Sequence, residues 1–174
     1  HARLRQIISM YADVAPNIIE FGREEHNKPF LTKPSNSALH FNLSHSLELA
    51  ICAIGTLHPL GVDIEKVREQ CNFDISDRFF SKNEQDCLLK LANDEKRLTF
   101  YRIWARKEAM VKATGKGIAQ PLSSFSVSGQ DITETILLDS QPWQLIPIHV
   151  NDTYQAALAC HPSIRHIHFH DADK

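Results

Sequence analysis

The chain has 174 residues, of which 43% are hydrophobic and 23% are charged, with a formal net charge of -2. This length suits one globular domain, or two small halves packed together. The near-neutral charge offers no general field for nucleic acid, so nucleic acid is not an expected partner. No stretch approaches the roughly eighteen apolar residues of a membrane span and no signal peptide is present, so we expect a cytoplasmic protein with no membrane association. The four cysteines lack C-x-x-C spacing, which argues against a structural zinc site.

The first half of the sequence predicts a helix followed by strands. Apolar residues recur at three- and four-residue steps from Arg3 to Tyr11, which is the period of an amphipathic helix. A short strand is expected at 17–21, and the polar, proline-containing stretch 22–37 predicts a surface loop. Further strands are expected at 39–43, at 49–54 and in the segment that ends with Asp63-Ile64-Glu65.

The second half predicts helices followed by strands. Ser81, with Glu84 three residues later, is a capping-box pattern for a helix that runs through Leu91. Another helix starts near Asp94, and the apolar run to Thr114 has Gly115 as its C-cap. Strands are then expected at 125–128, 135–138, 143–150 and 154–160.

A helix followed by a strand-rich region therefore occurs twice in the chain. The helices are 3–11 and 106–114, and the regions end in the apolar strands 49–54 and 156–160. This repeat predicts an α+β fold of two pseudo-twofold-related halves, with the functional site at their interface. We place the first half at 1–60 and the second at 61–174.

Two groups of charged residues suggest metal and phosphate chemistry. Asp63 and Glu65 at i and i+2 of a strand project to one face, which suits a divalent cation; a solvated strand end is the alternative. Glu108 and Lys112 share a helix face at i and i+4, where a surface ion pair is the alternative. Trp104 extends that face by one turn, which favours a functional surface.

Three other motifs are less specific. In Asn42-Leu43-Ser44-His45-Ser46, hydroxyls and an imidazole follow an apolar strand; anion binding, a Ser-His nucleophile pair and a capped turn are all open. Gly115-Lys116-Gly117 lacks the remainder of a phosphate loop, so it reads better as a helix stop. The alternating histidines of 166–170 suggest either a metal chelate or a weakly ordered tail.

In combination, these motifs resemble a known enzyme family. The residues that carry the resemblance, in order along the chain, are Phe41-Asn42-Leu43-Ser44-His45-Ser46, Gly61-Val62-Asp63-Ile64-Glu65, Phe79-Phe80-Ser81, Trp104-x-x-Lys107-Glu108-Ala109-x-x-Lys112 and Gly115-Lys116-Gly117. The chain resembles the 4′-phosphopantetheinyl transferases of the surfactin-synthetase-activating type over almost its whole length. The resemblance implies the pseudo-twofold fold of that family.

The resemblance also implies an activity. The expected enzyme transfers 4′-phosphopantetheine from coenzyme A to a serine of an apo acyl or peptidyl carrier protein and releases adenosine 3′,5′-bisphosphate. It implies that Asp63, Glu65 and Glu108 hold Mg²⁺, and that Glu108 and Lys112 are catalytic. The residues that it implies for coenzyme A binding are Ser44, His45, Lys28, Pro29, Lys107, Lys112 and Arg3.

The remaining expectations concern the state of the protein and the rival functions. The chain begins with His1 rather than Met, and the resemblance implies a further N-terminal segment and a monomer. One rival function is another Mg²⁺-dependent phosphoryl-transfer or nucleotide-hydrolysing enzyme. Another is a degenerate, non-catalytic carrier-protein binder, although its expected sign, the loss of an acid such as Asp63 or of Lys112, is missing.

Overall fold

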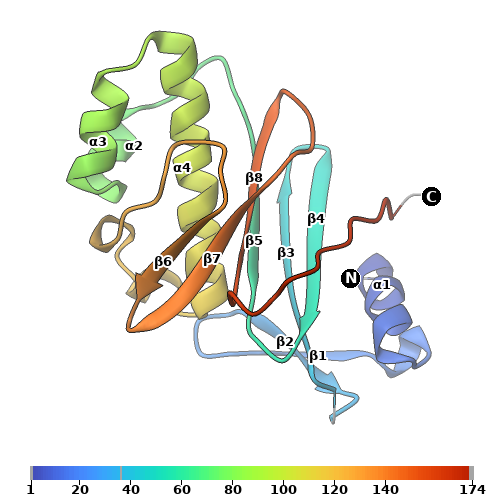
Figure 1. Cartoon of the computed structure of the whole chain (residues 1–174). Coiled ribbons are helices and arrows are strands. Elements are labelled where there is room, and N and C mark those ends of the chain that lie inside the picture. The colour runs from blue at the N-terminus through green and yellow to red at the C-terminus, as the bar shows by residue number, and fades with distance from the viewer. Residues whose placement is uncertain (1, 36, 173–174) are drawn as a thin grey trace.

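The structure, a computed structural model, describes residues 2–35 and 37–172 of the chain (Figure 1). Helices are combined with antiparallel sheets, as the predicted α+β class requires. None of the described helices is long and apolar enough to cross a membrane. In the described residues the elements are, in chain order, α1 (Ala2–Ala12), β1 (Glu20–Arg23), β2 (Pro29–Lys33), β3 (Leu39–Ser46), β4 (Leu49–Thr56), β5 (Gly61–Lys66), α2 (Asp74–Phe79), α3 (Lys82–Leu89), α4 (Asn93–Thr114), β6 (Glu134–Leu138), β7 (Gln141–Ile148) and β8 (Tyr154–Cys160).

The larger sheet has four strands in the order β5-β8-β7-β6, and all its pairs are antiparallel. Helix α4 lies across one face of this sheet, over β5 and β8, while α2 and α3 lie on the far side of α4 (Figure 1). The main core fills the space between α4 and the sheet, with Phe100, Ile103, Met110 and Leu145 among its members. Strand β5 therefore runs directly beneath the long helix.

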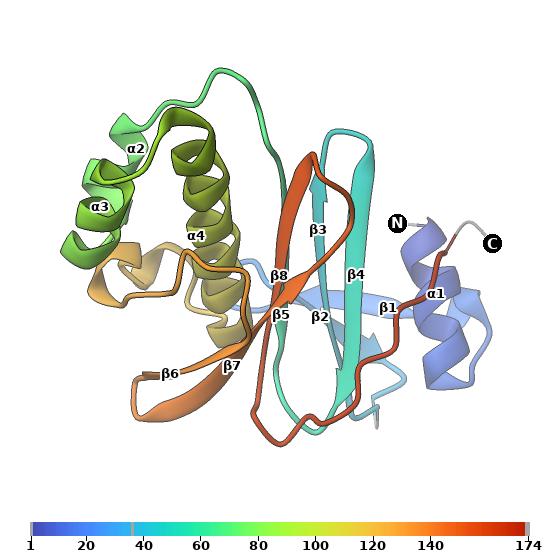
Figure 2. The same cartoon turned by 45° about the horizontal axis from the view of Figure 1, so that its top comes forward.

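The first part of the chain forms two hairpins, β1-β2 and β3-β4. Figure 2 shows the β3-β4 hairpin beside β5, with α1 on the side of the hairpin away from α4. A small core formed by Ile8, Ile19 and Phe41 holds α1 against this hairpin. A separate cluster that includes Val62 and Leu158 fills the face of the large sheet opposite α4, and Ile51 of β4 packs against it.

The predicted helices are confirmed, and their ends have the expected caps. Helix α3 begins after a complete capping box, in which the Ser81 side chain accepts from the Glu84 N–H and the Glu84 side chain accepts from the Ser81 N–H. Helix α4 ends at Gly115, whose φ of 72° lies in the left-handed region that glycine adopts readily.

The strand predicted at 125–128 is wrong, because this segment is irregular. The N–H of Val127 donates to Glu84 Oε1 and the N–H of Ser128 donates to Glu134 Oε1, each at 2.8 Å. Carboxylates therefore satisfy backbone donors that a neighbouring strand would otherwise bind.

The loop predicted at 22–37 is also wrong in part. Residues 29–33 form β2, which pairs with β1 in an antiparallel hairpin. Proline at the first position of β2 made the segment read as a loop, although a strand tolerates proline at its first residue. The short helix α2 was not predicted.

Candidate active site

The carboxylates of β5 face α4. Side chains alternate along a strand, so Val62 and Ile64 enter the cores on the opposite face while Asp63 and Glu65 point toward the helix. Asp63 is only 4% exposed. A carboxylate in such a place requires hydrogen bonds or a cation as compensation.

Side chains of β3, rather than the β3 backbone, bind the edge of β5 that does not pair with β8. Asn42 Oδ1 accepts from the Val62 N–H at 2.8 Å, and Ser44 Oγ accepts from the Ile64 N–H at 3.3 Å. In the same way, Ser46 Oγ accepts from the Lys66 N–H at 3.0 Å. We call this line of contacts between β3 and β5 the seam.

Ser44 and Lys112 bind the same oxygen of Asp63. The Ser44 hydroxyl donates to Asp63 Oδ1 at 2.8 Å, and the Lys112 ammonium donates to that atom at 2.6 Å. Lys112 Nζ also donates to Ser44 Oγ at 2.9 Å and to the Val62 carbonyl at 3.3 Å. By contrast, Asp63 Oδ2 is buried and has no hydrogen-bond partner among the described residues. One oxygen of this carboxylate is thus saturated and the other is left for a further ligand.

Close contact between α4 and β5 brings Lys112 to Asp63. A Cβ placed on Gly61 would lie 2.2 Å from the Ala109 carbonyl oxygen and 2.3 Å from the Ala113 nitrogen, so only glycine fits there. The small side chains of Ala109 and Ala113 complete the contact, since both are buried against the sheet. The sequence therefore sets a short distance between helix and strand at the site.

Glu65 and Glu108 complete a cluster of negative charge. Burial, followed by the charge of Asp63, raises the pKa of Glu65 to about 7, although a hydrogen bond from the Trp104 side chain acts in the opposite direction. Burial and the charge of Asp63 also raise the pKa of Glu108, against the attraction of Lys112. Three acidic groups that oppose one another's ionisation form an environment that a cation would stabilise.

The arrangement fits a divalent cation without being closed around one. Among residues 2–35 and 37–172, no three His, Cys, Asp or Glu side chains converge closely enough to hold a metal ion as they stand. The unpartnered Asp63 Oδ2 and the neighbouring carboxylates of Glu65 and Glu108 nevertheless provide the oxygen donors that Mg²⁺ prefers. The residues therefore fit the expected metal, and the Lys112 ammonium lies beside Asp63 on its other oxygen.

Lys107 does not belong to this cluster. Its side chain is fully buried, its Nζ lies 2.9 Å from Glu84 Oε2, and it donates to the Leu122 and Phe125 carbonyls at 2.7 and 2.6 Å. In this position three acceptors already bind its three N–H donors, and the contact of Lys107 with coenzyme A stays a prediction. Lys107 joins α4 to α3 and to the segment that follows α4.

Ser44 and His45 have different environments although they are neighbours in the sequence. Ser44 is buried in the seam, whereas His45 points away from it and is exposed. The Ser44 hydroxyl is already bound by groups of the protein, while His45 stays available to an anion; both stay predictions as coenzyme A ligands. Asn42 and Ser46 were not recognised as seam residues, yet the period-two spacing of Asn42, Ser44 and Ser46 places them on one face of a strand.

The other residues expected at coenzyme A make contacts outside the carboxylate cluster. Lys28 is half-buried and donates to the Leu60 and Ala113 carbonyls at 3.3 and 3.1 Å, and burial lowers its pKa. Pro29 follows it at the start of β2. Arg3 is exposed on α1, where it contacts the Ala172 carbonyl. These three residues stay predictions as coenzyme A ligands.

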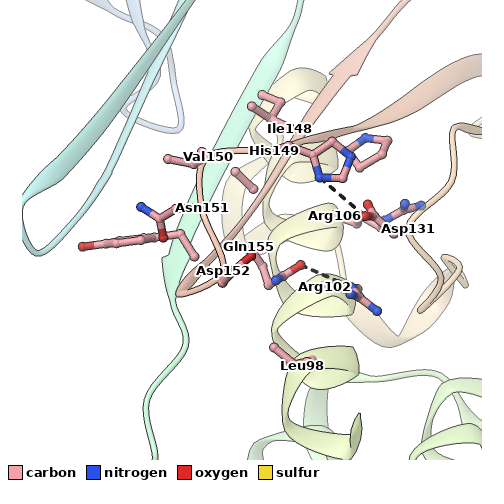
Figure 3. A pocket seen from close by; sticks show the side chains of 13 residues that line it. Leu98, Arg102, Arg106, Asp131, Ile148, His149, Val150, Asn151, Asp152 and Gln155 are labelled. Carbon is pink, nitrogen blue, oxygen red and sulfur yellow. Dashed lines mark hydrogen bonds and ion pairs between the residues drawn. The ribbon is translucent and has the colours of Figure 1, made fainter.

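A cavity of about 420 Å³ lies on another side of α4, against the turn between β7 and β8. Figure 3 shows Arg102 and Gln155 pointing toward each other inside it, with 3.2 Å between Arg102 Nε and Gln155 Oε1. Asp63, Glu65, Glu108 and Lys112 do not line this cavity. It is therefore separate from the carboxylate cluster.

Comparison with known proteins identifies the family. Residues 59–159 match the model of the 4′-phosphopantetheinyl transferase superfamily, and the chain belongs to this superfamily of transferases. The matched range contains β5, α4 and β8, and so includes both the carboxylates and Lys112.

Individual relatives carry the same family name. The chain is 39% identical over 163 residues to the 4′-phosphopantetheinyl transferase Sfp of Bacillus subtilis, covering 91% of this chain and 71% of that protein. It is 35% identical over 158 residues to the 4′-phosphopantetheinyl transferase HetI of a Nostoc species, covering 90% and 66%. It thus spans about two thirds of the length of these relatives. A crystal structure of Thermotoga maritima holo-[acyl-carrier-protein] synthase aligns with a TM-score of 0.40 and 19% identity, over 59% of this chain and 61% of that one.

Proposed function

We propose that this protein transfers 4′-phosphopantetheine from coenzyme A to a serine of an apo acyl or peptidyl carrier protein. The observation that carries the proposal is the pairing of Asp63 on β5 with Lys112 on α4. This pairing uses one oxygen of Asp63 and leaves the other, Oδ2, without a partner among the described residues, so that it can bind a cation. The products are the phosphopantetheinyl carrier protein and adenosine 3′,5′-bisphosphate. Family membership supports the same reaction.

Mg²⁺ would be held by Asp63, Glu65 and Glu108, and when bound it would neutralise charge on the pyrophosphate. Glu108 accepts the proton of the carrier serine, directly or through a water molecule, because its carboxylate lies among the charged groups of the site, close enough to feel Asp63 and Lys112. The serine oxygen then bonds to the phosphorus next to pantetheine, and the bond to the bridging oxygen breaks. The electron pair leaves with adenosine bisphosphate, and no covalent enzyme intermediate forms.

Lys112 has two tasks in this proposal. In the free protein its ammonium balances Asp63. In the reaction it stabilises the negative charge that develops on the leaving bisphosphate, which needs an ammonium of modest exposure, and the Lys112 side chain is 27% exposed. His45, Lys28 and Pro29 are the proposed neighbours of the nucleotide and its phosphates, with Arg3 as a further basic contact.

We also propose that the two halves, 1–60 and 61–174, are related by pseudo-twofold symmetry. In each half a helix precedes an antiparallel hairpin, α1 before β3-β4 and α4 before β7-β8. The site would then lie at the interface of the halves, where Ser44 meets Asp63. A monomer suffices for this site, because a single chain supplies the acids and Lys112.

The test is to incubate the protein with Mg²⁺, coenzyme A and an apo carrier protein and to examine the carrier by mass spectrometry. We expect a phosphopantetheine adduct on one serine. Glu108→Gln should abolish the adduct while coenzyme A still binds, and Glu95→Gln, at an exposed site on the same helix, should leave it unchanged. Absence of the adduct with several carriers would overturn the proposal.

The same reactions distinguish the rival functions. Release of nucleotide from coenzyme A at equal rates with and without the carrier would indicate a hydrolase. Capture of the apo carrier without any adduct would indicate a non-catalytic binder. For the transferase, we expect adenosine bisphosphate to accumulate only with the carrier, in amounts equal to the adduct.

A further inference from the structure

The hydroxyl of Ser44 lies where the seam meets the carboxylate cluster. It donates its hydrogen to Asp63 Oδ1 at 2.8 Å and accepts hydrogen bonds from the Lys112 ammonium at 2.9 Å and from the Ile64 N–H at 3.3 Å. Ser44 is itself only 6% exposed. Three groups from two elements of the site therefore meet at a single oxygen atom.

A serine hydroxyl has one hydrogen to donate and two lone pairs to accept with. Ser44 uses all of them in these three bonds, so it has no capacity left for a phosphate. These bonds also restrict the orientation of the Asp63 carboxylate. Because both the hydroxyl and the ammonium bind Oδ1, the Asp63 plane is fixed with Oδ2 left without a partner.

We propose that Ser44 is a positioning residue: it orients Asp63 and the Lys112 ammonium across the seam so that Asp63 Oδ2 is presented to the divalent cation. This inference rests on the proposed function, since it assigns Ser44 to the metal site of that reaction. It replaces direct phosphate binding as the reason for a serine at this position. Partners that orient metal ligands commonly change metal affinity by about 10–100-fold when they are removed.

Ser46 provides a matched control on the same strand. Its hydroxyl accepts from the Lys66 N–H at 3.0 Å, which is the seam bond that Ser44 makes with Ile64. Among the contacts of the described residues, Ser46 Oγ has none with Asp63 or Lys112. Ser44→Ala and Ser46→Ala thus each remove one seam bond, but only Ser44→Ala removes the bonds to the site.

The experiment compares Ser44→Ala, Ser46→Ala and Ser44→Thr with the wild type, using the full chain. Mn²⁺ binding is followed by electron paramagnetic resonance, and kcat and KM for coenzyme A are measured with an apo carrier protein. We expect Ser44→Ala to weaken Mn²⁺ binding and lower kcat by about tenfold each, with KM changed less than threefold. Ser46→Ala should stay within twofold of the wild type, and Ser44→Thr, which keeps the hydroxyl, should recover most of both losses.

A second readout needs neither metal nor turnover. The Lys112 ammonium signal in a ¹⁵N spectrum of the metal-free protein should be sharp in the wild type and in Ser46→Ala. It should shift and broaden in Ser44→Ala, because Ser44 Oγ is one of its three acceptors. Thermal denaturation checks that Ser44→Ala and Ser46→Ala are folded and lose similar stability, a few degrees in Tm.

Two results would overturn the inference. One is that Ser44→Ala and Ser46→Ala change Mn²⁺ affinity and the Lys112 signal equally, which would make Ser44 a seam residue only. The other is a tenfold rise in KM for coenzyme A with unchanged Mn²⁺ affinity, which would restore the phosphate contact. Failure of the proposed function would give a different result, because the wild type itself would form no carrier adduct. The Lys112 signal would still test whether Ser44 orients the Lys112 ammonium.

Discussion

Two lysines of α4 each pair with a carboxylate of another element, and the two pairs have similar distances but differ in how completely their polar atoms are hydrogen-bonded. Glu84 and Lys107 lie 2.9 Å apart, with side chains 3% and 0% exposed. Asp63 and Lys112 lie 2.6 Å apart, with side chains 6% and 27% exposed. The two lysines are five positions apart on the same helix, so the main difference between the two pairs is the set of groups around each one.

The Glu84-Lys107 pair is saturated. Glu84 accepts from the Ser81 and Val127 N–H groups at 2.7 and 2.8 Å. Lys107 gives its remaining donors to backbone carbonyls. Every group in this pair has a protein partner, and therefore it can contribute to stability but has nothing left with which to bind a ligand.

The Asp63-Lys112 pair is incomplete. In the part of the chain that the structure describes, one Asp63 oxygen is buried without a partner, and the neighbouring Glu65 has a pKa raised to about 7. Unsatisfied groups of this kind cost stability, so their presence points to a function that compensates for the cost. Completeness of hydrogen bonding, rather than burial or ion pairing, distinguishes Lys107 from Lys112, the lysine that we propose for the reaction.

The largest predicted effect separates these two lysines. Lys107→Met leaves the Glu84 carboxylate buried without its cation, and we expect the free energy of unfolding to fall by about 3–5 kcal/mol. Lys112→Met should cost less, about 1–2 kcal/mol, because Asp63 keeps Ser44 and can take up a proton. Urea denaturation of the metal-free proteins measures both losses.

A double variant checks the cause of the loss at Lys107. Adding Glu84→Gln to Lys107→Met removes the stranded charge, so part of the lost stability should return. Equal losses for Lys107→Met and Lys112→Met would remove the distinction between the pairs. A well-folded Lys107→Met that binds coenzyme A weakly would return Lys107 to the nucleotide site.

The second effect concerns the approach of α4 to β5. Gly61→Ala places a Cβ against backbone atoms of Ala109 and Ala113, so the helix must shift, and we expect a loss of about 2–3 kcal/mol. Gly55→Ala is the control, because its Cβ would meet only the flexible end of Leu60, at 2.8 Å. The shift should also weaken Mn²⁺ binding, since it moves Lys112 away from Asp63. Similar unfolding curves for the two variants would contradict the described contact.

The sequence predicted the incomplete pair better than the complete one. Asp63 and Lys112 were recognised because each belongs to a short motif with a regular spacing. Lys107 was grouped with them, although helical geometry separates it: Glu108 and Lys112 are one turn apart on one face, while Lys107 is turned by about 100° from Glu108. A motif identifies which residues matter without saying which face each one occupies.

Contacts between segments that are distant in the sequence could not be predicted from local sequence patterns. The partner of Lys107 is Glu84, which the sequence indicated only as half of a capping box, and nothing local links the two. The seam is similar, since Ser44 meets Asp63 only after β3 and β5, which belong to different sheets, come together. The α+β class and most helices follow from periodicity, whereas partners that are far apart in sequence depend on the tertiary arrangement.

The third prediction uses the raised pKa of Glu65. Its value of about 7 in the folded protein exceeds the ordinary 4.5, so the unfolded state loses its proton first as pH rises, and stability falls between those values. Discounted for partial solvent exposure, the fall is on the order of 1–2 kcal/mol. Glu65→Gln should lack this fall. The measurement is the difference in unfolding free energy between the wild type and Glu65→Gln, determined at pH 5 and again at pH 8. Saturating Mg²⁺ should cancel it in the wild type, and a constant difference across this range would refute the shift.

The smallest effect tests how Glu84 is held in the saturated pair. Ser81→Ala removes the α3 cap, in which Ser81 Oγ accepts from the Glu84 N–H at 3.4 Å, but it keeps the Ser81 N–H that donates to the Glu84 carboxylate at 2.7 Å. We therefore expect a loss of only about 0.5–1 kcal/mol by urea denaturation, with Ser81→Thr close to the wild type. Carrier modification and Mn²⁺ affinity should not change. A loss as large as that of Lys107→Met would mean that the hydroxyl, rather than the backbone, orients Glu84, and the pair would then depend on a serine as Asp63 does.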